Sequence, residues 1–302
     1  MSTLIRVQDL VKTFGTHRAV DGIDLDVASG QVFGFLGPNG AGKSTTIRML
    51  LGLFQPTSGR AEIFGLDVRR NGTDIRRRVG YLPGELALYP KLTGRDYLDR
   101  IARIRGGSTP RREALATRFG ASLDRPVHTL SKGNRQKIGL VAAFMHDPEL
   151  LVLDEPTSGL DPLLQREFAQ LLEETIARGR TVFLSSHDLD EVQRLAHQVA
   201  IIRVGRIVVS DTVEALRSRS PRTIELTLRS TVEAAAFTGL PGVRVTAVEG
   251  PRVTFRVDGA ADGVARLFEA AVPLGIEDVA ARSANLDELF LSFYSREDAH
   301  VG

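Results

Sequence analysis

Apolar runs and amphipathic stretches alternate along most of this chain, and the alternation predicts strands followed by helices. Some apolar runs are continuous, which is typical of strands buried on both faces. These runs are QVFGFLG at 31–37, ELLVLDE at 149–155 and TVFLSSH at 181–187. Helical periodicity follows them, at about 42–52, 162–178 and 188–196. Strands alternating with helices predict an α/β fold with a mostly parallel sheet.

Weaker patterns fill the rest of the first 220 residues. Short strands are predicted at 4–7 and 23–27, a turn and strand at 55–65, a basic helical turn leading into a strand at 69–82, and a strand pair around a glycine turn at 198–208. Helical periodicity dominates 93–120, apart from GGSTP at 106–110. Ser131 is predicted to cap a helix that runs to about 146. We therefore expect a helical subdomain at about 86–146.

The pattern changes near SRSPR at 218–222, where a period of two begins. Strands are predicted at 223–229, 243–250 and 252–259, the last two as a hairpin, with an amphipathic helix at 261–275, a strand at 276–283 and a closing helix at 285–294. We expect two domains, 1–220 and 221–302, divided near Pro221. The second is predicted to be a small α+β domain with a βαββαβ order.

The composition excludes several classes of chemistry. The chain has 302 residues and no cysteine, so disulfides, thiol catalysis and cysteine-based zinc sites are excluded. Lysine occurs five times, which leaves 39 − 5 = 34 arginines, but the net charge is only +2. This balance favours an arginine-biased composition over nucleic-acid binding. The first ten residues lack a signal-peptide pattern, and no apolar stretch reaches the roughly 18 residues of a membrane span. The basic run at 69–78 is a solvated face or a contact for lipid headgroups or an acidic partner.

The stretch GPNGAGKSTT matches the pattern G-x-x-x-x-G-K-[ST] through Gly37, Gly42, Lys43 and Ser44. Glycine tolerates the close approach and the dihedral angles that let backbone N–H groups surround a phosphate chain. The helix that follows adds its N-terminal N–H groups and dipole. In such a loop Lys43 reaches the β- and γ-phosphates, and the Ser44 hydroxyl holds Mg²⁺. A plain glycine-rich turn is the alternative, and the buried strand before the loop argues against it.

A pair of carboxylates follows about 110 residues later, in LLVLDEPTSGLD. Asp154 ends a predicted buried strand, a position that suits a carboxylate directed at Mg²⁺ through its water shell. Glu155 comes next and would point elsewhere, where a carboxylate can orient and deprotonate an attacking water. On its own such a pair is as often merely solvated, but the upstream glycine loop favours the metal and base roles.

Four motifs, in this order and spacing, resemble the nucleotide-binding subunit of an ATP-binding cassette (ABC) transporter. They are GPNGAGKST at 37–45, LSKGNRQK at 130–137, LLVLDEPTSGLDP at 150–162 and SSH at 185–187. The resemblance covers about residues 2–220, and other P-loop enzymes lack the LSKGN element. It implies the P-loop NTPase fold of an ABC ATPase domain, with a mixed sheet and a helical subdomain. It also implies an ATPase that works as a head-to-tail dimer with two ATP molecules between the subunits.

The resemblance assigns further roles residue by residue. LSKGN resembles the LSGGQ signature of the family, so Ser131 and Gly133 would meet the γ-phosphate of ATP held by the other subunit. Asp161 would lie in the loop that crosses the interface, His187 would be the switch histidine that contacts the γ-phosphate and positions Glu155, and Phe14 would stack on adenine. Glu155, His187 and Lys43 are thus the expected catalytic residues, and Ser44 and Asp154 the expected metal ligands. The expected nucleotide contacts are Phe14, Gly37, Pro38, Asn39, Gly40, Ala41, Gly42, Lys43, Ser44, Thr45, Thr46, Ser131, Gly133 and Asp161.

The chain departs from the family pattern after VGYLP, where the family places a glutamine that senses Mg²⁺ and the transmembrane partner. Gly84 and then Glu85 stand there instead. Either Glu85 substitutes for the glutamine, or the metal keeps an extra water. The loop GELALYP at 84–90 would still couple the subunit to its partner. In the signature, Lys132 and Asn134 also differ from the commonest residues.

The implied function is that of an ATP-hydrolysing subunit of an export system, with ATP and Mg²⁺ as cofactors. The tail ARSANLDELFLSFY at 281–294 resembles the small domain appended to exporter-type cassettes that pair with ABC-2 permeases. The expected partners are a transmembrane permease and a second nucleotide-binding subunit, either a copy or a paralogue, at the cytoplasmic face of the cell membrane; no nucleic acid is expected. The alternatives are a soluble ABC ATPase that acts on ribosomes or DNA, and a P-loop kinase or GTPase.

Overall fold

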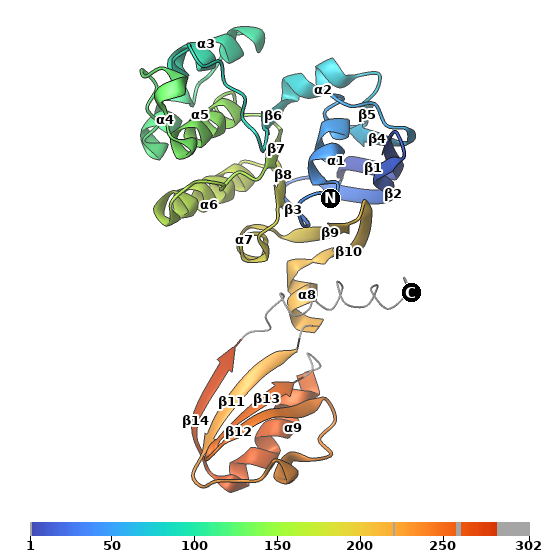
Figure 1. Cartoon of the computed structure of the whole chain (residues 1–302), viewed down its shortest axis with the longest axis vertical. Helices are drawn as coiled ribbons and strands as arrows, with labels where there is room; N and C mark the ends of the chain where they lie inside the picture. Colours follow the sequence, from blue (N-terminus) through green and yellow to red (C-terminus); the bar gives the residue numbers. More distant parts are fainter. Residues whose placement is uncertain (1, 220, 258–260, 283–302) are drawn as a thin grey trace. The chain divides into compact units, whose positions relative to one another are not determined.

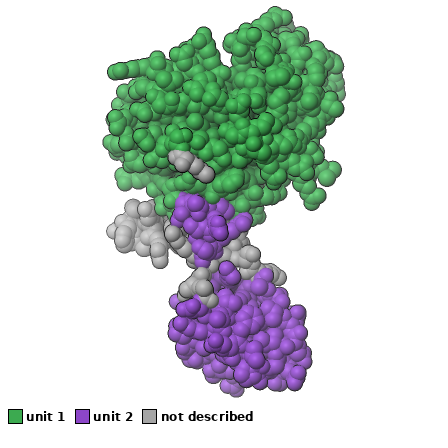
Figure 2. All heavy atoms as spheres, turned by 180° about the vertical axis from the view of Figure 1, so that it is seen from behind, with its two compact units in different colours: residues 1–210 green, residues 211–302 purple. Residues whose placement is uncertain are grey.

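The structure is a computed structural model that describes residues 2–219, 221–257 and 261–282. It divides into two compact units, residues 1–210 and 211–302, which Figure 2 colours separately. The division lies ten residues before the boundary predicted near Pro221, so α8 (Val213–Arg219) groups with the second unit. The closing helix predicted at 285–294 lies outside the described residues.

A six-stranded sheet forms the centre of the first unit (Figure 1). Its strand order is β10 (Arg206–Thr212), β9 (Gln198–Arg203), β3 (Val32–Leu36), β8 (Thr181–Ser186), β7 (Leu150–Asp154) and β6 (Val79–Leu82). The pairs β9–β3, β3–β8, β8–β7 and β7–β6 are parallel, which confirms the predicted parallel sheet. Every residue of β3, β7 and β8 is buried, as their continuous apolar sequences predict.

Side chains of the central strands alternate between two hydrophobic clusters, one on each face of the sheet. Leu151 and Leu153 of β7 pack with the first cluster, whereas Leu150 and Val152 pack with the second. The first cluster contains α3 (Gly94–Ile104), α4 (Arg112–Phe119), α5 (Lys132–Phe144) and α6 (Pro162–Ala177), and the second contains α1 (Lys43–Leu50) and α2 (Gly72–Arg78). The helix α7 (Leu189–Leu195) packs against β3 and β8.

The second cluster also contains a separate four-stranded sheet that the sequence patterns did not predict. Its order is β2 (His17–Ala28), β1 (Thr3–Phe14), β4 (Ser58–Ile63) and β5 (Leu66–Asp67), and all its pairs are antiparallel. The strands predicted as short pieces at 4–7 and 23–27 are twelve residues long. The register of the β1–β2 pair shifts at several points, and Asp9 has a φ of 44°. Such bulges interrupt the alternation of apolar residues, so one long strand has the pattern of a short one.

The region predicted as a helical subdomain contains α3, α4 and α5, with a short 3₁₀ turn (Val127–Thr129) before α5. Thr93 and Asp96 form a reciprocal capping box at the start of α3. Ser131 caps α5, since its Oγ accepts a hydrogen bond from the Asn134 N–H at 3.2 Å. The predicted cap is therefore confirmed.

Arginines of the basic run at 69–78 make contacts within the fold. Arg78 donates two hydrogen bonds to Glu149, at 2.7 and 2.8 Å, and its guanidinium lies 3.7 Å from the centre of the Phe64 ring. Arg69 and Arg76 donate to backbone carbonyls, those of Pro56 and Leu51. These contacts engage Arg69, Arg76 and Arg78 within the fold, whereas Arg70 and Arg77 lie on the exposed surface.

The second unit contains a four-stranded antiparallel sheet with its own core. The order is β12 (Val243–Glu249), β13 (Arg252–Val257), β11 (Arg222–Leu228) and β14 (Ile276–Arg282), and α9 (Ala261–Ala271) contributes Leu267 and Ala271 to the core. The predicted hairpin is confirmed. The first helix of the predicted βαββαβ order is only a 3₁₀ turn (Ala234–Phe237), because Gly239, Pro241 and Gly242 follow within a few residues and do not support a longer helix.

None of the helices in the part of the chain that the structure describes has the length and apolarity needed to cross a lipid bilayer.

The aromatic residues at the centre of the parallel sheet give a test of this core. Phe183 stacks on Phe33 at 5.6 Å between ring centres and lies 5.4 Å from Phe35. We expect Phe183→Ala to lower the free energy of unfolding by about 3–5 kcal/mol, because it leaves a cavity between two layers. Urea unfolding followed by circular dichroism measures the change. Leu163→Ala is the control, since Leu163 is 72% exposed, and it should change stability by only about 0.5 kcal/mol. Equal effects of the two substitutions would contradict the assigned core.

Candidate functional site

The phosphate-type loop connects the end of β3 to the start of α1, as its sequence predicts. Each of its three glycines is required for a different physical reason. Gly40 has a φ of 81° and open space around its Cα, so backbone conformation alone requires glycine there. A Cβ on Gly37 would lie 2.4 Å from the Ile202 carbonyl oxygen, so close packing requires glycine at that position. Gly42 has a φ of 111° and also faces the Ala19 carbonyl oxygen, 2.6 Å from the position of a Cβ.

Lys43 begins α1 and turns its side chain back into the loop. The residue is 6% exposed, and Nζ donates hydrogen bonds to the carbonyls of Gly37 at 2.6 Å and Pro38 at 3.2 Å. The ammonium therefore lies inside the loop, where it can meet a phosphate chain. The Thr46 hydroxyl donates to the Gly42 carbonyl at 3.0 Å, so it stabilises the first turn of α1.

Asp154 lies at the end of β7 and is 3% exposed. One carboxylate oxygen accepts a hydrogen bond from the Ser185 hydroxyl on β8. The other, Oδ2, faces Gly84: a Cβ at position 84 would lie 3.2 Å from it. A buried carboxylate with an oxygen directed at a position without a side chain fits Mg²⁺ coordination.

Among the described residues there is no group of three or more histidines and carboxylates that could hold a metal by themselves. A metal here would depend on Asp154, the Ser44 hydroxyl, waters and phosphate oxygens of a nucleotide, which is the usual way proteins hold Mg²⁺. Gly84 cannot be a ligand through a side chain, and Glu85 is exposed. Both alternatives, Glu85 as a substitute ligand and an extra water on the metal, stay predictions.

Glu155 and His187, directly after β7 and β8, come together with Lys43 at the start of α1. Nδ1 of His187 lies 2.7 Å from Oε2 of Glu155, and Nζ of Lys43 lies 3.4 Å from Oε1. Oε1 is buried and makes no hydrogen bond. One carboxylate oxygen is thus oriented by a histidine, while the other faces the lysine of the phosphate loop with its hydrogen-bonding capacity open. Such a carboxylate can accept a hydrogen bond from a water next to a bound phosphate.

The backbone of Glu155 has a φ of 52°, a left-handed conformation that is uncommon for a residue with a Cβ. This conformation explains how the two consecutive carboxylates point to different places: Asp154 toward Ser185 and Gly84, and Glu155 toward His187 and Lys43. Strained backbone is concentrated at functional sites.

The remaining predicted residues lie on other elements. Asp161 caps α6, because its carboxylate accepts a hydrogen bond from the Leu164 N–H at 3.0 Å. Asn134 is held by two hydrogen bonds with the backbone of Ser122, at 2.9 and 3.2 Å. Ser131 and Gly133 begin α5, which Figure 1 shows grouped with α3 and α4 and apart from α1. The chain itself therefore does not bring the signature residues to its own phosphate loop.

Phe14 ends β1 and is 45% exposed. Its ring meets Phe54 edge to face, with 5.7 Å between ring centres, and Lys12 Nζ lies 4.9 Å from its centre. A half-exposed ring held on one side leaves surface that can stack on a planar base.

Comparison with known proteins matches the family described as ABC transporter at residues 20–158. The bacitracin transport ATP-binding protein BcrA of Bacillus licheniformis is 39% identical over 76% of this chain and 76% of its own length. The daunorubicin resistance ATP-binding protein DrrA3 of Streptomyces coeruleorubidus is 35% identical over 96% of this chain and 95% of its own length. A solved ATP-binding subunit of an ABC transporter superposes with a TM-score of 0.66 at 32% identity, over 71% of this chain and 92% of that one.

The chain belongs to the ABC transporter family. It is an ATP-binding, ATP-hydrolysing subunit, with the P-loop NTPase fold that the motifs predicted. The resemblance drawn from the four motifs is confirmed, and the interpretation as a kinase or GTPase is excluded.

Three polar residues of this ABC subunit support the site but were missed by sequence reasoning. Ser185 bonds to Asp154, and Gln136 on α5 is 5% exposed and donates to the carbonyls of Glu155 at 3.2 Å and Pro156 at 2.8 Å. Glu191 on α7 is also 5% exposed and accepts a hydrogen bond from the Ser186 hydroxyl. The available signal was weak: serines at the end of an apolar strand, and polar residues at helix positions that otherwise face the core.

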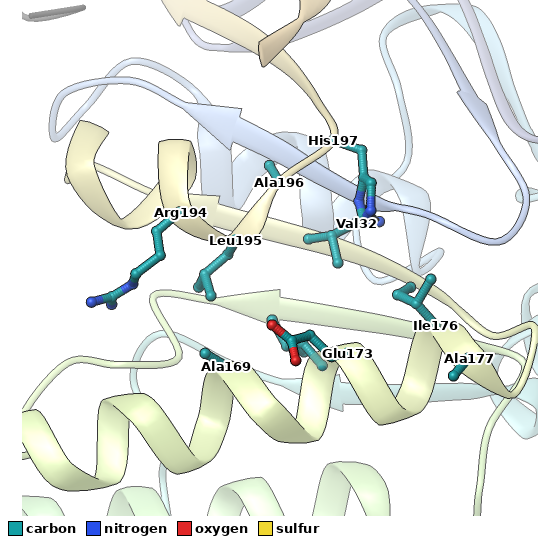
Figure 3. A pocket seen from close by; sticks show the side chains of 10 residues that line it. Val32, Ala169, Glu173, Ile176, Ala177, Arg194, Leu195, Ala196 and His197 are labelled. Carbon is teal, nitrogen blue, oxygen red and sulfur yellow. Dashed lines mark hydrogen bonds between the residues drawn. The ribbon is translucent and has the colours of Figure 1, made fainter. Parts of the chain in front are cut away.

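A cleft of about 420 Å³ lies elsewhere on the ABC unit, between α6 and α7 (Figure 3). Val32, at the amino end of β3, is part of its lining, and its N–H donates to Nδ1 of His197 at 3.1 Å. The lining includes none of the predicted nucleotide contacts. In parallel α/β sheets nucleotides bind at the carboxyl ends of the strands, so this cleft is not the ATP site.

Glu191 gives a pH-dependent prediction. Burial raises the pKa of its carboxyl above the ordinary 4.5, and the neighbouring charges of Glu155 and Asp188 raise the pKa further, whereas hydrogen bonds with Ser186 and Thr157 act in the opposite direction. The unfolded chain therefore releases this proton at a lower pH than the folded chain does. The contribution of Glu191 to the free energy of unfolding is therefore fully present below pH 4.5. It is lost as the pH rises through the raised pKa of this carboxyl.

We expect Glu191→Gln to remove this loss, because a carboxamide does not titrate. The melting temperature of the variant minus that of the unaltered protein should become more positive by about 2 °C or more between pH 4.5 and pH 8. Glu173→Gln, at an exposed position, is the control and should show no such trend. A difference that stays constant with pH would contradict the raised pKa of the Glu191 carboxyl.

Proposed function

We propose that this ATPase energises export through a separate membrane permease, by a dimer that closes on ATP and reopens after hydrolysis. The observation that carries the proposal is the Lys43–Glu155–His187 arrangement beside the buried Asp154, which provides phosphate binding, a base and a metal ligand at one edge of the sheet. Two relatives are named for bacitracin transport and daunorubicin resistance, and these names support export as the direction of transport.

The roles within one subunit follow from the contacts. The loop 37–42 and the start of α1 surround the phosphates with N–H groups, and Lys43 exchanges its carbonyl contacts for the β- and γ-phosphates. Ser44 and Asp154 would hold Mg²⁺, which would supply positive charge to neutralise the phosphates. Glu155 orients the attacking water and accepts its proton, while His187 holds the Glu155 carboxylate in position.

The second half of each site comes from another subunit. Ser131 caps α5, so the first N–H groups of this helix can bind an anion, but α5 lies apart from the phosphate loop of its own chain. A head-to-tail dimer brings Ser131 and Gly133 to the γ-phosphate held by the partner, and the exposed Asp161 loop to the interface. Each ATP then has more contacts in the closed state than in the open one, so ATP shifts the equilibrium toward closure.

Export requires a partner that crosses the membrane. The loop 84–90 is positioned to couple the two proteins, because Gly84 lies beside Asp154 while Tyr89, at the other end, is 66% exposed. The subunit then acts at the cytoplasmic face of the cell membrane, held there through the permease. The second unit is shared with the daunorubicin resistance relative, which matches 96% of this chain, and we assign it a regulatory or dimer-stabilising role.

Removal of the proposed base tests the mechanism. We expect Glu155→Gln to bind ATP, to hydrolyse it about 10²- to 10⁴-fold more slowly, and to accumulate as a dimer with ATP, because the closed state is no longer released by hydrolysis. Phosphate release and size-exclusion chromatography with and without ATP measure the two effects. Glu173→Gln serves as the control. Turnover of Glu155→Gln at the unaltered rate would show that another group is the base.

Copurification tests the export assignment. Tagged full-length chain, isolated from detergent-solubilised membranes of the producing organism, should retain a polytopic membrane protein in a near-stoichiometric amount. A chain that instead retains ribosomes or DNA would support the soluble ABC ATPase alternative and contradict export. The Glu155→Gln chain with ATP should retain the membrane protein as well, because closure does not depend on hydrolysis.

A further inference from the structure

The first turn of α5 packs against the loop 155–160 of the same subunit. A Cβ on Gly133 would lie 2.7 Å from the Gly159 carbonyl oxygen, so the two backbones are almost in direct contact. The aliphatic part of the Lys132 side chain passes beside Gly159, 3.5–3.7 Å from the position that a Cβ there would take. At its end, Nζ of Lys132 donates a hydrogen bond to the Ser158 hydroxyl at 2.9 Å.

The loop 155–160 joins two functional positions. It begins at Glu155 and leads to Asp161, the cap of α6. Its internal turns are held by Ser158 N–H donating to the Glu155 carbonyl at 3.2 Å and by Leu160 N–H donating to the Thr157 carbonyl at 2.9 Å. A contact made at Ser158 is therefore one hydrogen bond away from the backbone of the proposed base.

Gln136 attaches the other end of this loop to α5, through its bonds to the carbonyls of Glu155 and Pro156. Lys132 and Gln136 lie one turn apart on the helix. Between them they hold the loop at two points, and the Lys132 contact exists only because a side chain is present where the family signature LSGGQ has glycine.

We propose that Lys132 is a positioning residue that ties the signature turn to the loop 155–160 within one subunit. Through Ser158 it restrains the backbone on which Glu155 is held in its left-handed conformation. The inference rests on the proposed function in one respect: in the dimer, Ser131 faces the partner's ATP while Glu155 faces the subunit's own. Lys132 then makes the turn that serves one ATP move together with the loop that serves the other.

The competing role for Lys132 is direct contact with the γ-phosphate of the partner's ATP. The two roles differ in their dependence on Ser158. If Lys132 acts through its hydrogen bond to Ser158, replacing Lys132 has no further effect once the serine hydroxyl has been removed. If Lys132 contacts the phosphate, replacing it lowers turnover whether or not Ser158 is present. A double-mutant cycle separates the two.

The first measurement is ATP turnover of the full-length chain carrying Lys132→Met, Ser158→Ala or both. We expect each single substitution to lower kcat by about threefold to tenfold with little change in KM for ATP, because the restraint acts on the base and not on nucleotide binding. The double variant should be no slower than the slower single variant. Lys132→Arg should recover most of the loss, since it restores a donor. Lys91→Met, at another exposed lysine, is the control and should leave turnover unchanged.

The second measurement is amide hydrogen exchange of residues 155–161 in the same variants. Lys132→Met should speed exchange of this loop by about threefold or more without ATP, and Lys91→Met should not. This readout does not require hydrolysis, so it tests the Lys132–Ser158 contact separately from the proposed function, which unaltered turnover of Glu155→Gln would contradict on its own. Additive losses of kcat in the double variant, or unchanged exchange in Lys132→Met, would overturn the inference.

Discussion

The parallel pairing of three buried strands determines where the phosphate loop, Asp154 and Glu155 lie. Leu36 of β3 pairs with Ser186 of β8, and Ser185 of β8 pairs with Asp154 of β7, so the three strands end at one edge. The side chains of each strand divide between the two clusters, so a slip by one residue would exchange the side chains that pack in the two layers. The phosphate loop, the proposed metal ligand Asp154 and the proposed base Glu155 follow directly from these strand ends, so packing of the core places these residues.

The backbone of Glu155 is strained, in contrast to the regular strands beside it. Glu155 adopts a left-handed backbone beside a fully buried strand, and the surroundings hold it there: its N–H donates to the Ser185 carbonyl at 3.1 Å, and its own carbonyl accepts from Gln136. Such a conformation costs about 1–3 kcal/mol and persists only where several neighbours determine it together. In this subunit those neighbours come from β8 and α5, so the position of Glu155 depends on both the parallel sheet and the helical layer.

Features with a local physical cause could be predicted from the sequence. The glycine loop, the Ser131 cap and the buried strands each depend on a few adjacent residues, and the structure contains all of them. The separate antiparallel sheet could not be predicted, because bulges in β1 hide its period. Gln136 and Ser185 were missed for a related reason: their partners, Glu155 and Asp154, are 19 and 31 residues away along the chain, and only the packing of α5 and β8 brings them together. The roles of the individual site residues stay predictions.

The alternation of β7 side chains between the two layers has a practical consequence. Leu153 touches the helical layer and Val152 touches the layer that contains the phosphate loop, although the two residues are neighbours in the chain. A methyl group on each would sense a different half of the ABC unit in nuclear magnetic resonance. If the helical layer rotates against the nucleotide layer, the two signals will shift independently, and a single strand thereby reports the relative motion of both halves.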